Sequence, residues 1–202
     1  MSCCETPYSN FDLVGDGASS IAGLSDVALT NLANDEVLKY NSTTEKWENG
    51  GSVVLVTAYK TDVTETFPSD TEKDLAGFTT DIDTTGGAFT PSTGEFTAPR
   101  NGYYRLNLQI FVDKRSGSNM RELVIRIMKD TGGGYTIFSE FYGTGSVTGA
   151  TVDYNSLNTH QVISLNSGNK IKIELISRGQ SCVIWGFSNP TRRLTFFSIE
   201  KI

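Results

Sequence analysis

The chain has 202 residues, 38% of them hydrophobic, and a formal net charge of −6, so it is long enough to bury a core. Its 24 Thr and 20 Gly residues suit helix interiors poorly and predict an all-β fold. No apolar run approaches the roughly 18 residues of a membrane helix, so we expect no membrane insertion. The acidic balance disfavours nucleic acid as a partner, because phosphate contact needs clustered Lys and Arg.

The first 49 residues differ from the rest of the chain. Up to Asn34 they are mostly small and polar, and they could not bury a core alone. Two short β-prone runs then flank a polar turn and predict a β-hairpin, with Leu38, Tyr40 and Trp47 as its apolar residues. An isolated hairpin is marginal in water, so we expect it to lean on a symmetry mate. Residues 1–49 are therefore predicted to be an extended stalk or docking segment.

A second domain is expected at residues 50–202, where short apolar runs alternate with turn residues. No stretch has helical periodicity, and about ten strands at a spacing of 8–12 residues predict a sandwich or jelly roll. Residues 67–89 are interpreted as a polar connection, and residues 143–158 as a connection with weak strand character. The expected strands are 52–59, 95–97, 103–112, 122–129, 135–142, 160–165, 170–177, 181–187 and 194–202.

The run at residues 103–112 alternates most clearly. Successive side chains of a strand point to opposite faces, so one set of residues should face the core. That set is Tyr104, Leu106, Leu108, Ile110 and Val112. The other set is too mixed for a core and too aromatic for a plain solvent face. It consists of Tyr103, Arg105, Asn107, Gln109 and Phe111.

Residues that could carry out catalysis are sparse. His160 is the only histidine and has no Gly-x-Ser-x-Gly nucleophile elbow, so we interpret it as a surface or strand residue. Carboxylates could still meet across strands, as in a glycosidase, but nothing in the sequence singles out a pair. We therefore expect no enzyme activity, no catalytic residue and no cofactor.

Metal binding and disulfide bonding are also weakly indicated. A solvated face is favoured over a calcium site for one acidic group, because it lacks EF-hand spacing. This group is Asp70, Glu72, Asp74, Asp81 and Asp83. The odd cysteine count favours reduced thiols, with a crosslink through terminal Cys3 or Cys4 as the alternative.

Residues 89–104 have a turn, then Gly-x-Phe, then Pro, Gly and Tyr leading into a strand. This segment resembles the globular heads of complement component one, subcomponent q, a family allied to tumour necrosis factor. Similar segments follow in order at 123–129, 138–142, 162–173 and 195–199, so the resemblance covers about residues 52–202. Asn169 and Ser198 depart from the family pattern.

The resemblance implies a ten-stranded jelly roll that assembles as a homotrimer, with the sheet containing strand 103–112 packed against its neighbours. The candidate trimer interface is therefore the mixed face, namely Tyr103, Arg105, Asn107, Gln109 and Phe111. An ordinary exposed strand is the alternative. Exposed loops are the expected route of attachment to a host surface glycan or protein. Their candidate residues are Lys114, Arg115, Asn119, Trp185, Arg192 and Arg193, although Trp185 could also belong to a buried strand.

Residues 24–49 are similar to a stalk module of phage fibres, which ends in Leu-x-Tyr and Lys-Trp-x-Asn. A collagen-like Gly-x-y run is missing. Together the two resemblances imply a virion structural protein, a trimeric fibre or capsid spike that meets other virion proteins through residues 1–49. We expect synthesis in the host cytoplasm, because the N-terminus shows no secretory signal. The alternative is a secreted or cell-surface recognition module of the same jelly-roll family.

Overall fold

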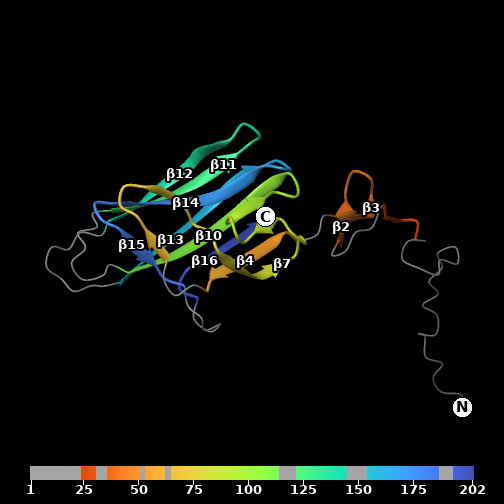
Figure 1. The fold of residues 1–202 in the computed structure, drawn as a ribbon. Coiled ribbons are helices and arrows are strands. Elements are labelled where there is room, and N and C mark those ends of the chain that lie inside the picture. Colours follow the sequence, from red (N-terminus) through yellow and green to blue (C-terminus); the bar gives the residue numbers. More distant parts are fainter. Residues whose placement is uncertain are drawn as a thin grey trace, which may run out of the picture. The chain divides into compact units, whose positions relative to one another are not determined.

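The computed structural model describes residues 24–30, 36–50, 53–61, 65–113, 122–144, 154–186 and 193–202. The chain divides into two compact units, Met1–Ser52 and Val53–Ile202, and each is treated by itself. Every regular element among the described residues is a strand, as the threonine and glycine content predicts (Figure 1). Within these residues, no helix is long and apolar enough to cross a membrane.

The first unit contains a small three-stranded sheet. Strands β2 (Val37–Asn41) and β3 (Lys46–Gly50) form the predicted antiparallel hairpin, and β1 (Val27–Ala28) pairs parallel to β3. The ring of Tyr40 meets that of Trp47 edge-on, with centroids 5.5 Å apart. Both rings and Leu38 are exposed, so this sheet does not bury its own apolar side chains.

Two sheets form the second unit (Figure 1). The seven-stranded sheet contains β4 (Leu55–Lys60), β5 (Glu65–Phe67), β7 (Phe78–Asp83), β10 (Gly102–Asp113), β13 (Tyr154–Leu165), β15 (Cys182–Ile184) and β16 (Phe196–Lys201). The six-stranded sheet contains β6 (Glu72–Asp74), β8 (Phe89–Thr90), β9 (Glu95–Thr97), β11 (Glu122–Asp130), β12 (Tyr135–Thr144) and β14 (Lys170–Arg178). The predicted two-sheet sandwich is confirmed, and three-residue strands β5, β6 and β15 extend it.

The core lies between the sheets and follows the alternation of the sequence. In β10 the five residues predicted to face inward are all buried, at 0–2% exposure. Side chains of β11 and β14 pack opposite them from the other sheet. These are Leu123, Ile125, Ile127, Ile171, Ile173 and Leu175. The outer faces of both sheets are left to polar and mixed residues.

Two segments interpreted as connections contain strands. Residues 67–89 include β6 and β7, which are polar because each lies at the margin of a sheet and pairs with one strand only. Strand β13 begins at residue 154, not 160, and pairs with β10 along its whole length. The sequence does not predict the first residues of β13 as a strand, because Ser156 and Asn158 are polar residues exposed on the outer face.

Gly94 ends the turn between β8 and β9 in a conformation that favours glycine. Its φ is +68°, and its amide donates a hydrogen bond of 2.9 Å to the carbonyl oxygen of Thr90. A Cβ at this position would lie 2.2 Å from the carbonyl oxygen of Leu75, which is backbone and cannot swing away. Gly94 therefore allows the turn to pack against the chain just after β6.

We expect Gly94→Ala to lower the free energy of unfolding by about 2 kcal/mol, because it adds backbone strain and a steric clash. Thermal unfolding followed by circular dichroism would measure the loss. Gly133→Ala is the matched control, since nothing lies within 4 Å of a Cβ at Gly133. Its unfolding free energy should stay within about 0.5 kcal/mol of wild type. Equal melting temperatures for the two variants would contradict the prediction.

Candidate functional site

The outer face of the seven-stranded sheet carries the predicted interface residues. Tyr103 lies opposite Ser164 of β13, and the amide of Ile202 donates a hydrogen bond of 2.9 Å to its carbonyl oxygen. Arg105 lies between Val162 of β13 and Glu200 of β16. The cross-strand rows continue in the same order: His160, Asn107 and Ser198, then Asn158, Gln109 and Phe196.

One end of this face is apolar and open to solvent. Tyr103, Val162, Ile202 and Val53 are 52–62% exposed. The amide of Lys201 donates a hydrogen bond of 2.9 Å to the carbonyl oxygen of Val54. This pairing places the preceding residue, Val53, next to Ile202. Single exposed apolar residues are normal on a protein surface, whereas a contiguous group on a flat sheet suits a protein–protein contact. We call Tyr103, Val162, Ile202 and Val53 the apolar patch.

Polar side chains hold the remainder of the face in place. Arg105 Nη1 and Glu200 Oε1 lie 2.8 Å apart, with both side chains more than a third exposed. Such surface pairs stabilise a single chain little. Asn107 Nδ2 donates to Ser198 Oγ at 3.2 Å, and Gln109 Nε2 donates to the carbonyl oxygen of Leu194 at 2.9 Å. These bonds hold side chains of β10 against β16 and against the residue pair that precedes it.

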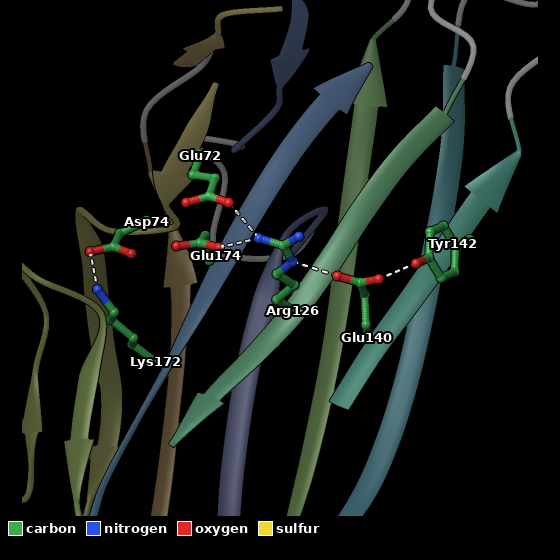
Figure 2. Close-up of polar contacts among 7 residues, drawn as sticks. All are labelled: Glu72, Asp74, Arg126, Glu140, Tyr142, Lys172 and Glu174. Atoms are coloured by element: carbon green, nitrogen blue, oxygen red, sulfur yellow. Dashed lines mark hydrogen bonds and ion pairs between the residues drawn. The ribbon is translucent and has the colours of Figure 1, made fainter. Parts of the chain in front are cut away.

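The six-stranded sheet carries a second group that the sequence did not reveal (Figure 2). On its outer face three carboxylates from three strands converge on Arg126 of β11. Arg126 Nη1 lies 2.6 Å from Glu72 Oε1 and 3.1 Å from Glu174 Oε1, and its Nε donates to Glu140 Oε2. The Tyr142 hydroxyl donates to the other oxygen of Glu140. We call these residues the Arg126 cluster.

Hydrogen bonds within the Arg126 cluster favour the charged forms of Arg126 and Glu140. The hydrogen bond to Glu140, followed by those to Glu72 and Glu174, raises the pKa of Arg126 above its usual value. The hydrogen bond from Tyr142 and then that from Arg126 lower the pKa of Glu140. The same bond to Glu140 raises the pKa of Tyr142. Glu140 is therefore held ionised beside Arg126, and the contacts of this one cation link β6, β14, β11 and β12.

A second row of contacts continues along this sheet. Lys172 Nζ lies 2.7 Å from Asp74 Oδ2 (Figure 2) and 4.5 Å from the centroid of the Tyr135 ring. The Tyr135 hydroxyl donates to Glu95, and Lys170 Nζ lies 2.9 Å from the same carboxylate. Burial, followed by the bond to Glu95, raises the pKa of Tyr135. These contacts join β14 to β6, β9 and β12.

The acidic group interpreted as a solvated loop face lies mainly on strands and contacts other side chains or backbone. Glu72 and Asp74 are the β6 residues just described. Asp81 lies 2.7 Å from Arg193, and Asp83 accepts from the amide of Thr85 at 2.8 Å. Among the described residues, no three His, Cys, Asp or Glu side chains are arranged to hold a metal ion.

Similar folds occur among solved structures. Eiger TNF from S. frugiperda matches with a TM-score of 0.56 and 12% identity, over 74% of this chain and 92% of that one. Murine APRIL matches with a TM-score of 0.53 and 13% identity, over 75% of this chain and all of that one.

The fold is a jelly roll. Identities this low establish the fold alone, and at that level they agree with the family resemblance of residues 52–202. The globular domain of zebrafish complement 1qA protein matches with a lower TM-score of 0.48, at 13% identity over 74% of this chain and 95% of that one. No family model and no curated protein matches the sequence.

The jelly roll brings together only part of the predicted attachment site. Lys114, Arg115, Asn119 and Arg192 lie outside the described residues. Trp185 is half-buried, and its backbone amide donates to the carbonyl oxygen of Phe111 at 3.0 Å, which continues the sheet beyond β15.

Arg193 is held against the outer face of the jelly roll. Its guanidinium lies 5.1 Å from the centroid of the Tyr59 ring and 2.7 Å from Asp81 Oδ2. These contacts fix the chain just before β16 on the sheet that carries the apolar patch.

We expect Arg126→Gln to destabilise the jelly roll by about 2 kcal/mol at pH 7, because three carboxylates lose a shared cation. The lowered pKa of Glu140 contributes stability at pH values above the pKa of an unfolded glutamate, about 4.3. This contribution is lost as the pH falls through the pKa of Glu140 in the folded chain. Protonation also relieves repulsion in the variant. The difference from wild type should therefore shrink as pH falls from 7 towards 3, as measured by urea unfolding.

Arg178→Gln is the control for this prediction. Arg178 is 48% exposed and its Nε lies 3.6 Å from Glu122, so its loss should change the unfolding free energy by less than about 0.5 kcal/mol. If the two variants lost the same stability with the same pH dependence, the Arg126 cluster would not act as a unit.

Proposed function

We propose that this chain is a non-enzymatic assembly module whose jelly roll forms a homotrimer through the outer face of β13, β10, β16 and β4. The apolar patch is the observation that carries the proposal. Tyr103, Val162, Ile202 and Val53 lie in two neighbouring rows of one sheet face and offer an exposed apolar surface that a second copy could cover. The centre of this face is polar but its side chains are already fixed by hydrogen bonds, so little side-chain entropy remains to be lost on contact.

A second exposed apolar group favours a ring over a two-fold dimer. Ile137 and Phe138 of β12 are exposed on the other sheet. A two-fold contact pairs one patch with itself and would leave the second group uncovered. A heterologous contact joins two different patches, and it gives a closed ring where the rotation between neighbouring copies closes. The family resemblance of residues 52–202 supports three as the number of copies.

The role we propose for the trimer is the head of a virion fibre or capsid spike, with host attachment through its loops. The resemblance of residues 24–49 to a phage-fibre stalk supports this role, as do the exposed rings of Tyr40 and Trp47, which suit contact with other virion proteins. A secreted or cell-surface recognition module is the second candidate, and the fold shared with Eiger TNF favours it.

Light scattering coupled to size exclusion should give a mass three times the chain mass of 22.0 kDa. Arg105→Glu should weaken association by about 2 kcal/mol or more, roughly 30-fold, because it sets a second carboxylate beside Glu200 and buries unpaired charge. A wild-type chain that elutes at 22.0 kDa would contradict the assembly.

Arg178→Glu is the matched control for the assembly. It makes the same change at an arginine that is 48% exposed, against 51% for Arg105, and that pairs with Glu122 on the other sheet. This variant should keep the wild-type mass. Equal weakening by both substitutions would mean that charge alone disturbs the assembly and that the outer face is not its interface.

The virion role has its own test. Antibodies raised against residues 53–202 should label purified virus particles from a culture that produces this chain. Label confined to cell surfaces or to the culture medium would overturn the virion role and favour the recognition module instead.

A further inference from the structure

We propose that the short strands β5 and β15 form a lid on the jelly roll, and that Glu65 latches this lid closed between Lys60 and Lys73. The lid opens and closes while the rest of the jelly roll stays folded. It is a device of the single chain and does not depend on the proposed assembly. Sparse backbone pairing, a sealed thiol and one bridging carboxylate support the proposal.

Few backbone contacts attach the lid to the seven-stranded sheet. Its two strands have three residues each, and they pair with each other along that length. Two residues of β15, Val183 and Ile184, pair onward with the last two residues of β10 (Figure 1). By comparison, β13 pairs with β10 over twelve residues. Local opening needs less free energy where backbone pairing is sparse, so the lid opens more readily than β13.

The inner side of the lid closes the core at the C-terminal end of β10. Phe67, Cys182 and Ile184 are 0–1% exposed, and all three belong to the core between the sheets. The Cys182 thiol is therefore a native reporter, because a reagent in water reaches it when the lid opens or the chain unfolds. Trp185 follows β15 directly, and opening would release its amide from the carbonyl oxygen of Phe111. The lid thus also controls the position of a residue predicted to take part in attachment.

Glu65 joins the lid to one strand of each sheet. Its Oε2 lies 2.6 Å from Lys60 Nζ at the end of β4, and its Oε1 lies 2.8 Å from Lys73 Nζ of β6. Strand β4 belongs to the seven-stranded sheet and β6 to the six-stranded sheet. Lys73 Nζ also donates to the carbonyl oxygen of Thr66 at 3.0 Å and lies 4.7 Å from the centroid of the Phe67 ring. These contacts fasten β5 to strands with which its backbone does not pair.

The burial of Lys60 raises the free energy of the open lid. The side chain of Lys60 is 1% exposed, whereas that of Glu65 is 23% exposed. Lys60 Nζ also donates to the carbonyl oxygen of Ala76 and lies 5.6 Å from the centroid of the Phe78 ring, but neither group carries a formal charge. Opening the lid removes Glu65, and a buried ammonium group without a carboxylate is strongly unfavourable. The ion pair therefore favours the closed lid.

Alkylation of Cys182 by iodoacetamide, measured on the full chain, tests the inference. Peptide mass spectrometry reports Cys182 separately from Cys3 and Cys4, which lie far from it in the sequence. The wild-type rate should lie well below that of an exposed thiol. It should stay nearly constant at low urea concentrations, because opening the lid exposes little surface, whereas labelling through global unfolding rises steeply with urea.

Glu65→Gln should raise the alkylation rate of Cys182 about tenfold, because the closed lid then no longer supplies Lys60 with a counter-charge. Lys73→Gln should raise it less, by about threefold, since Lys73 is 38% exposed. Glu95→Gln is the matched control, because the Glu95 side chain is also 23% exposed and lies 2.9 Å from a lysine, but belongs to β9. Its rate should stay within about twofold of wild type.

Each contrary outcome overturns the lid. A wild-type rate that rises with urea as steeply as global unfolding would mean that Cys182 is reached only in the unfolded chain. Wild-type alkylation as fast as that of an exposed thiol would mean that the lid is not closed. Equal rates in Glu65→Gln and Glu95→Gln would remove the latch. Where circular dichroism shows that Glu65→Gln does not fold, a wild-type rate in Lys73→Gln would remove it instead.

The same measurement separates the lid from the proposed assembly. Arg105→Glu, which is expected to weaken the trimer, should leave the alkylation rate of Cys182 unchanged. A monomeric wild-type chain with a slow, urea-insensitive rate would overturn the assembly and support the lid. A rate that rises in Arg105→Glu as much as in Glu65→Gln would mean that neighbouring copies cover Cys182, and would overturn the lid as a device of the single chain.

Discussion

The two-residue period of β10 is the constraint on which both faces of the jelly roll depend. Its buried side chains, such as Tyr104 and Leu106, form the centre of the core, and the residues between them form the outer face. Because β10 pairs with β13 along its length and with β15 and β16 on its other side, its neighbours hold the same alternation. A slip of one residue would exchange core and surface, so the core that stabilises the fold also fixes which residues a partner could meet.

The alternation along β10 was predictable because five apolar residues repeat at every second position without interruption. The margins of the sheets were less predictable. Strands β6 and β7 carry few apolar residues, and what makes them strands is pairing with β14 and β4 rather than their own composition. Local sequence carries little record of such pairing, so these segments have the composition of loops.

The Arg126 cluster shows the same limit for a site. Its members come from four strands, and the sequence does not state which register brings Glu72, Glu140 and Glu174 to one arginine. One signal was present. Arg126 stands alone in an otherwise apolar run, and a charged residue within a buried strand usually has a partner. The outer face of β10 was found because all five of its residues belong to one strand.

The position of β16 in the sheet has a consequence for the order of folding. It lies between β10 and β4, although it is the last of the described strands to be synthesised. Until β16 is inserted, β4 and β7 cannot join the part of the sheet that contains β10. High sequence separation of this kind slows folding. The surface that would join the copies therefore exists only after β16 is in place, so growing chains on neighbouring ribosomes would lack the finished face and would not join prematurely.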